Sequence, residues 1–325
     1  MIDFSRMRSS TRKGFAWIRE NPFTFLLIAL LAIFSLNFFV RALLYASFPY
    51  EIDQGEGVTI EVASWPLEGR PFYKRVRSRS AENVIEELVE IKKLGYREVF
   101  FRDETFTVFK DRNIRISKEM IQRKLGLTWI CNSKMDTIDK EMIHLMKEAG
   151  CHMIKFGVES CNQNILDNLQ KGTTVDQIRR VFKWTQEIGI DTHAHMMIGN
   201  PGDTMDTIRE TVRVLLELNP TTASFAVSTP YPGTELFERV RKQRPEIGDG
   251  TRADLSSLHV EGLLTETYCQ IPKNQLGKLQ RYAYRRFYLR PSYTLRWLKR
   301  IKNLDELKRV IFAATNLFDF SIRGE

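Results

Sequence analysis

The sequence has only four cysteines and only one long apolar run, and the scarcity of each excludes a class of protein. No CxxC pair occurs, and the four cysteines lie too far apart for a disulfide framework or a CxxC metal knuckle. We interpret them as reduced thiols: Cys131, Cys151, Cys161 and Cys269. No second apolar run reaches the ~18 residues of a membrane helix, which excludes a bundle of such helices. The remaining composition, 43% hydrophobic and 27% charged over 325 residues, is that of a globular protein with room for one large domain or two smaller ones.

The one long apolar run lies near the N-terminus. Residues 21–40, NPFTFLLIALLAIFSLNFFV, carry no charge. As a helix this run is about 30 Å long, the thickness of a bilayer's hydrocarbon core, so we predict a single transmembrane helix over residues 21–43. A buried helix of a globular domain is the alternative. Residues 1–20 form a basic flank, and the positive-inside rule then places the rest of the chain on the extracytoplasmic side.

Residues 44–75 form an acidic loop and a junction. The segment 44–62, LYASFPYEIDQGEGVTIEV, follows the apolar run and resembles the N-terminus of membrane glycosyltransferases. By that resemblance Asp53 would be a catalytic carboxylate. The alternative is that Asp53 and Glu56 are solvated loop carboxylates. The change in character between Val62 and Arg75 indicates a junction between two unrelated ancestries, as in a gene fusion.

Residues 76–242 alternate between strand-like and helical patterns. The strand-like runs are 98–106, 127–132, 152–158, 191–198 and 223–229. Before the first run we predict a helix capped by Ser80. Between the runs we predict one helix from about Asp136, one with a capping box of Thr174 and Gln177, and one capped by Asp203. Repeated strand–helix units imply a parallel sheet. We therefore predict an α/β fold with a partial TIM-like barrel; an open doubly wound sheet is the alternative.

Polar side chains gather where the predicted strands end. In both architectures a ligand sits at the carboxyl ends of the strands, and acids, an amide and glycine-rich backbone at that rim suit a small polar ligand with an amine, a carboxylate and a ribose. His193 and His195 point to one face of their strand, and an H-x-H pair can bind a metal. With no third ligand in view, we interpret the two histidines as side chains that fill the barrel interior.

The C-terminal extension, residues 243–325, is basic and predicted to be helical. From Lys273 to Glu325 there are 13 Lys and Arg against 4 Asp and Glu. Such a tail, interleaved with aromatic residues, can contact anionic lipid. The alternative, which we favour, is a pair of amphipathic helices that pack their aromatic face on the domain. Nucleic acid is not an expected partner.

Four segments of the chain, in this order and spacing, resemble one family. They are FFRDETFT, MDTIDKEMIHLMKEAGCHMIKFGVESCNQNIL, MMIGNPGDTMDTI and TPYPGTELF. Together they resemble the radical SAM superfamily, in particular its cobalamin-associated B12-binding subgroup, over about residues 76–305. The resemblance implies a barrel of the radical SAM type that binds S-adenosylmethionine. It places the cofactor-binding residues at Asp103, Glu104, Lys134, Glu159, Ser160, Ile198, Gly199, Asn200, Pro201 and Gly202.

The resemblance also implies a [4Fe–4S] cluster held by a CxxxCxxC motif, and this motif is missing. Aligned on Ser64-Trp65-Pro66, the three expected cysteine positions hold Glu56, Ile60 and Ala63. A carboxylate, a branched alkyl chain and a methyl group do not hold such a cluster. The segment before the barrel is also too short for the subgroup's cobalamin-binding domain. The metal site is therefore expected to be absent.

Three hypotheses on function follow. The family resemblance implies a radical SAM enzyme that acts by methyl transfer or C–C/C–H chemistry, but the missing ligands predict that this chain is inactive on its own. A cluster-free remnant that binds S-adenosylmethionine or serves as a scaffold is the second hypothesis. A membrane glycosyltransferase fragment that uses Asp53 is the third. The small-molecule substrate is not readable from the sequence. A cytosolic reductant would place the barrel inside the cell, against the charge rule.

Overall fold

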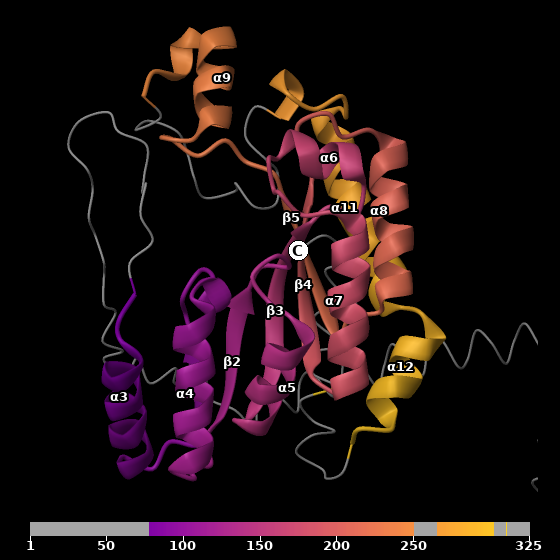
Figure 1. Cartoon of the computed structure of the whole chain (residues 1–325). Coiled ribbons are helices and arrows are strands. Elements are labelled where there is room, and N and C mark those ends of the chain that lie inside the picture. The colour runs from indigo at the N-terminus through magenta and orange to yellow at the C-terminus, as the bar shows by residue number, and fades with distance from the viewer. Residues whose placement is uncertain (1–77, 250–264, 302–309, 311–325) are drawn as a thin grey trace, which may run out of the picture. The chain divides into compact units, whose positions relative to one another are not determined.

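The computed structural model describes residues 78–249, 265–301 and 310 (Figure 1). The chain divides into two compact units, Met1–Trp65 and Pro66–Glu325, and all described residues belong to the second. The transmembrane helix predicted over residues 21–43, Asp53, and positions 56, 60 and 63 lie outside the described residues. Within the described part of the chain, no helix has the length and apolarity needed to cross a bilayer.

The described elements alternate between strands and helices up to β5. The strands are β1 (Glu98–Phe101), β2 (Thr128–Ser133), β3 (Cys151–Glu159), β4 (Asp191–Ile198) and β5 (Thr222–Val227). The α-helices are α3 (Ala81–Lys93), α4 (Lys110–Gln122), α5 (Lys140–Glu148), α6 (Gln163–Asn168), α7 (Val175–Ile188), α8 (Met205–Leu218), α9 (Glu235–Gln243), α11 (Lys273–Tyr288) and α12 (Pro291–Leu298). Short 3₁₀ turns are η1 (Phe106–Val108), η2 (Pro245–Ile247) and η3 (Thr265–Thr267).

The five strands form one parallel sheet in the order β1-β2-β3-β4-β5. A sequential order is that of a barrel, because a doubly wound sheet reverses its order at a switch point. Consecutive helices from α3 to α8, the short α6 excepted, pack against one another along one face of the sheet. The prediction of an α/β fold with a TIM-barrel-like parallel sheet is confirmed. In Figure 1 the carboxyl ends of the strands point toward α6 and α9.

The two faces of the sheet differ in burial. The helix-covered face is at most 3% exposed in β2 to β5, at Trp129, Cys131, Ile154, Phe156, Ala194, Met196, Ala223 and Phe225. Side chains that alternate with these are half-buried. We call this second side the inner face; it comprises Phe100, Ile130, Asn132, Met153, Lys155, Gly157, His193, His195, Thr222 and Ser224. In a barrel it corresponds to the interior, and it is the side that is open for a ligand.

Most helix starts agree with the sequence, with two corrections. Ser80 caps α3, and Thr174 with Gln177 forms the capping box of α7. The helix predicted from about Asp136 begins at Lys140 with Asp139 as its cap. Asp203 does not cap α8; Thr204 does, because Asp203 accepts hydrogen bonds from the Asn200 N–H and the Thr207 hydroxyl.

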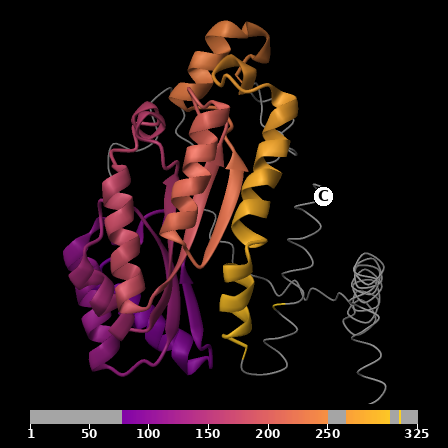
Figure 2. The ribbon, with the colours of Figure 1, turned by 90° about the vertical axis from the view of Figure 1, so that its right-hand side faces the viewer.

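The C-terminal helix α11 runs beside the last strand, β5 (Figure 2). The Gln280 amide donates to the Phe225 carbonyl at 2.7 Å, and the Phe225 N–H donates to the Tyr284 hydroxyl at 3.2 Å. Residues 280 and 284 are one helical turn apart, so one face of α11 meets successive groups of the strand edge. Phe287 of α11 and Tyr293 of α12 are also buried. The prediction that these two helices pack their aromatic face on the domain is therefore confirmed.

Candidate functional site

Glu159, at the carboxyl end of β3, has a backbone conformation unusual for its type. Its φ angle is +63°, in the left-handed region, and the register between β3 and β4 shifts between Gly157 and Glu159. Non-glycine residues in this region cost roughly 1–3 kcal/mol and cluster at functional sites. The shift brings the Glu159 carboxylate to 3.0 Å from the Lys171 ammonium; both side chains are mostly buried, at 18% and 23% exposure.

Gly157 leaves the space that this ion pair occupies. A Cβ atom at Gly157 would lie 2.9 Å from Glu159 Oε1 and 3.2 Å from Lys171 Nζ. Lys134 lies close to the loop that holds Lys171: its Nζ would be 3.9 Å from a Cβ atom at Gly172. Lys134 also forms an ion pair with Asp136. The structure thus brings Glu159 and Lys171 together, with Lys134 close to the residue after Lys171.

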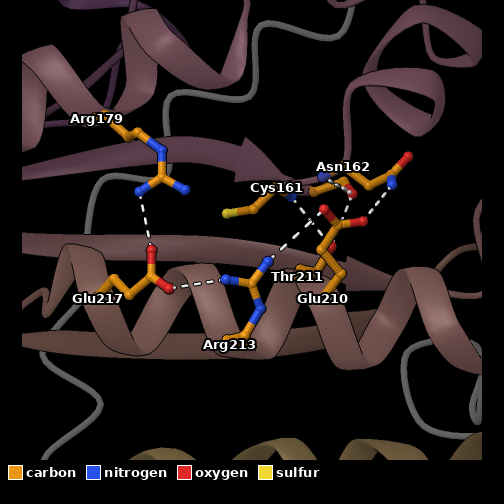
Figure 3. Close-up of polar contacts among 8 residues, drawn as sticks. Cys161, Asn162, Arg179, Glu210, Thr211, Arg213 and Glu217 are labelled. Atoms are coloured by element: carbon orange, nitrogen blue, oxygen red, sulfur yellow. Dashed lines mark hydrogen bonds and ion pairs between the residues drawn. The ribbon is translucent and has the colours of Figure 1, made fainter.

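Cys161 and Asn162 hold the chain after Glu159 to α8 (Figure 3), and Ser160 is turned to the same side, away from the inner face. Ser160 is 1% exposed, and its hydroxyl lies 3.0 Å from the Thr211 hydroxyl. The Cys161 N–H donates to the same Thr211 oxygen at 3.1 Å, and the Asn162 amide donates to Glu210 at 2.6 Å. These contacts fix the chain immediately after Glu159, which explains how its strained backbone is maintained.

The loop after β4, residues 198–202, is largely buried. Asn200 is 0% exposed, and its side-chain oxygen has no hydrogen-bond partner among the described residues. Burial raises the pKa of Asp203 beside it, although Thr207 and the Asn200 backbone donate to this carboxylate. An unsatisfied buried acceptor of this kind calls for a donor from outside the loop. Pro201 and Gly202 line a cavity of about 420 Å³ that also touches Asn168.

Asp103 and Glu104 line a different cavity. They are exposed at the end of β1, in a hollow of about 240 Å³ that also touches Arg112. None of its lining residues is shared with the cavity at Pro201 and Gly202. The sequence prediction grouped all these rim residues. The structure places Asp103 with Glu104 and Pro201 with Gly202 in two separate hollows, and Glu159 at the end of β3.

The two histidines of β4 belong to a hydrogen-bonded chain on the inner face. His193 bonds to the Thr222 hydroxyl at 2.8 Å through Nδ1 and to the Ser224 hydroxyl at 3.1 Å through Nε2. His195 Nδ1 lies 3.0 Å from the same Ser224 hydroxyl, and the two rings are 4.3 Å apart. Burial, then the charges of His195 and Lys155, lowers the pKa of His193 to about 3. The structure places both rings on the inner face, bonded to hydroxyl groups, as the interior interpretation expects.

All four cysteines of the chain lie in the described part, and no more than two of them, Cys131 and Cys151, lie side by side. Each is buried and free. Cys131 and Cys151 face the helices from neighbouring strands, Cys161 lies under α8, and Cys269 follows η3. Burial raises the pKa of Cys161 to about 12 and that of Cys269 to about 11. Among the described residues no three His, Cys, Asp or Glu side chains form a group that would hold a metal ion.

Comparison with known proteins decides the family. Residues 54–215 match the model of the radical SAM superfamily. The chain contains a radical SAM domain. The match starts before residue 76, where the resemblance in the sequence was placed, and so includes positions 56, 60 and 63.

Two curated relatives are similar to the chain over more residues than the domain match covers. The chain is 34% identical over 226 residues to an uncharacterized methyltransferase of Pyrococcus horikoshii, covering 69% of this chain and 48% of that protein. It is 30% identical over 181 residues to the anaerobic magnesium-protoporphyrin IX monomethyl ester cyclase of Rubrivivax gelatinosus, covering 55% and 31%. The chain thus spans half or less of these relatives' length.

A solved structure of a radical S-adenosylmethionine methyltransferase from Kitasatospora setae, with cobalamin and a [4Fe–4S] cluster bound, has a TM-score of 0.49 to this chain at 19% identity, covering 58% of this chain and 38% of that one.

Sequence reasoning missed Lys171. It follows α6 in a short loop, where a lysine before a glycine is unremarkable, and only the fold brings it to Glu159 across 12 positions of the chain. No local signal in the sequence distinguishes it from a surface lysine.

Proposed function

We propose that this chain binds S-adenosylmethionine at the rim of its radical SAM domain and does not assemble a [4Fe–4S] cluster from its own cysteines. The single observation that carries the proposal is the placement of the four thiols: all are buried, and no three converge. A radical SAM cluster needs three neighbouring thiolates. The residues present therefore do not fit the cluster, and no chemical step is assigned to it.

Burial itself opposes cluster binding at these thiols. Metal ligation requires the thiolate, and a raised pKa keeps Cys161 and Cys269 protonated at neutral pH. The desolvation that raises these pKa values also removes the access that iron and sulfide would need. Cys131 shares this environment, since burial raises its pKa well above the usual value.

The rim does fit S-adenosylmethionine, whose ribose, amine and carboxylate require acceptors and donors in fixed places. Glu159 offers a carboxylate that accepts from ribose hydroxyls, and Lys171 beside it offers a cation. The buried oxygen of Asn200 lacks a donor within the described chain, and the exocyclic amine of an adenine supplies one. Two of these three groups were predicted from the sequence as cofactor-binding residues.

A titration of the full-length chain with S-adenosylmethionine by calorimetry tests the binding half of the proposal. Wild type is expected to release heat, and Glu159→Gln to bind at least tenfold more weakly, because the acceptor charge is lost. The matched control is Glu187→Gln, whose carboxylate pairs with Lys140 on the outer surface at 2.6 Å; it should bind as wild type does. Absence of heat with wild type would remove the proposal.

Anaerobic reconstitution with iron and sulfide tests the other half. We expect a colourless protein without the broad absorbance at about 400 nm that iron–sulfur clusters give. Brown protein with about four iron and four sulfide per chain would contradict it. A Cys131→Ala variant, treated in the same way, then shows whether a buried thiol takes part.

A further inference from the structure

Two cationic side chains on the inner side of the sheet share one aromatic ring and have no acidic partner in the part of the chain that the structure describes. Arg102 Cζ lies 5.2 Å and Lys155 Nζ 5.0 Å from the centroid of the Phe100 ring. Within the described chain neither side chain makes an ion pair or a hydrogen bond, whereas Lys171 pairs with Glu159. The inner side therefore carries two positive charges, Lys155 on β3 and Arg102 just after β1, that no described residue compensates.

This arrangement is unfavourable for the protein alone. Burial, and secondly the charge of Arg102, lowers the pKa of Lys155. Contact with the Phe100 ring offsets only about 0.5–2 kcal/mol per cation. Lys155 is half-buried and Arg102 is exposed, and a cation with the burial of Lys155 is normally paired with a carboxylate. An anion from outside the described chain is the partner that the geometry lacks.

The neighbours of Lys155 are donors. In the registered row across the strands, Asn132 pairs with Lys155, Lys155 with His193, and His193 with Thr222. Arg102 is the first residue after β1 and extends the row there. It follows Phe101 in the chain as Asn132 follows Cys131, the register partner of Phe101 on β2. All these side chains carry N–H or O–H groups, while carboxylate and phosphate oxygens accept only. Cationic donors, above all the guanidinium, form the stronger bonds to such oxygens.

We propose that this row, which we call the cationic row (Arg102, Asn132, Lys155, His193 and Thr222), binds the anionic group of the substrate, a carboxylate or a phosphate. The inference rests on the proposed function in one respect, that the reacting end of the substrate meets S-adenosylmethionine near Glu159. Lys155 precedes Glu159 on β3 by roughly 13 Å at the rise of a strand. The substrate is therefore extended, with its anionic end against the cationic row and its reacting end farther along β3, at Glu159.

Calorimetry with two probe anions tests the cationic row. Pyrophosphate and tricarballylate are titrated, in one detergent buffer, into the full-length wild type, Lys155→Met and Arg102→Met. The control is Lys118→Met, an exposed lysine of α4. We expect wild type and the control to bind equally and both row variants to bind at least tenfold more weakly. The tighter of the two probes distinguishes a phosphate from a carboxylate source.

Thermal unfolding without anion is the second readout. Because each row variant removes one of two repelling charges, we expect Lys155→Met and Arg102→Met to unfold at or above the wild-type temperature. Unfolding of both variants below that temperature would show that the cations stabilise the fold and would overturn the proposal. So would wild type that binds neither probe, or an equal loss of affinity in Lys118→Met.

The same proteins separate this inference from the proposed function. Lys155→Met should still bind S-adenosylmethionine, and Glu159→Gln should still bind the preferred anion. Failure of S-adenosylmethionine binding with intact anion binding removes the proposed function alone. The reverse result removes the cationic row alone.

Discussion

The side-chain hydroxyl of Tyr288 makes two hydrogen bonds to the backbone of Ala223: it accepts the N–H at 3.0 Å and donates to the carbonyl at 2.6 Å. A neighbouring strand would use the same two backbone groups. Tyr288 is on α11 and Ala223 on β5, so a helical side chain substitutes locally for a strand.

Replacing Tyr288 by Phe should lower the free energy of unfolding by about 2 kcal/mol, because both buried backbone groups of Ala223 lose their partner. Tyr282→Phe is the matched control on the same helix: Tyr282 is half-buried and makes no hydrogen bond to a described residue, so a change below about 0.5 kcal/mol is expected. Urea unfolding measures both. Equal losses in the two variants would show that the hydroxyl of Tyr288 does not matter.

Gly157→Ala should weaken S-adenosylmethionine binding at least tenfold with little loss of stability. The new methyl group would press on the ends of two flexible side chains, Glu159 and Lys171, which move aside at small cost but leave their positions at the rim. Calorimetry and thermal unfolding measure the two effects. Gly277→Ala, in helix α11, controls for the exchange itself. Wild-type affinity of Gly157→Ala would separate the ion pair from ligand binding.

Stability should fall with acidification through His193. Its pKa is near 6.5 in the unfolded chain and about 3 in the folded one, so between these values the unfolded state holds more protons. The free energy of unfolding therefore decreases as pH falls through this window, by about 1.4 kcal/mol per pH unit near pH 5 for this one proton. Urea unfolding at several pH values should show a smaller slope for His193→Gln. Parallel slopes would contradict a neutral folded His193.

Gly150→Ala should be far more damaging than Gly189→Ala. Both glycines have positive φ angles, +98° and +77°, so alanine is strained at each by about 1 kcal/mol. At Gly150 the added Cβ would also collide with the carbonyl oxygen of Leu127, whereas nothing lies within 4 Å at Gly189. Backbone must then move, and we expect at least about 2 kcal/mol more. Similar melting temperatures for the two variants would argue against this clash.

The sequence predicted the parallel sheet well because its strands and caps have strong local signals. It missed α4, whose N-cap Phe109 makes no side-chain capping bond and whose buried face includes Asn113 and Ser117. It chose Asp203 over Thr204 as the cap of α8, since both residue types cap helices. The fold decides between them by committing Asp203 to Asn200 and Thr207.

The candidate site was only partly predictable for the same reason. Glu159 and the loop at Asn200 follow strands, and their position alone marks them as rim residues. The pairing of Lys171 with Glu159, and of Arg102 with Lys155 on one ring, depends on side chains that meet across the sheet. The outward turn of Ser160 depends on the left-handed backbone conformation of Glu159. No sequence pattern predicts this conformation for a glutamate.

Helix α11 also determines whether a strand of another copy of this chain can pair with the edge of β5. Gln280, Tyr284 and Tyr288 occupy backbone groups that would otherwise template intermolecular strand addition. At the other margin of the described sheet, β1 offers a ladder of only four residues. Loss of α11 would thus expose the edge of β5 to fibre growth or domain swapping. This basic helix therefore protects the protein from aggregation as well as completing the fold.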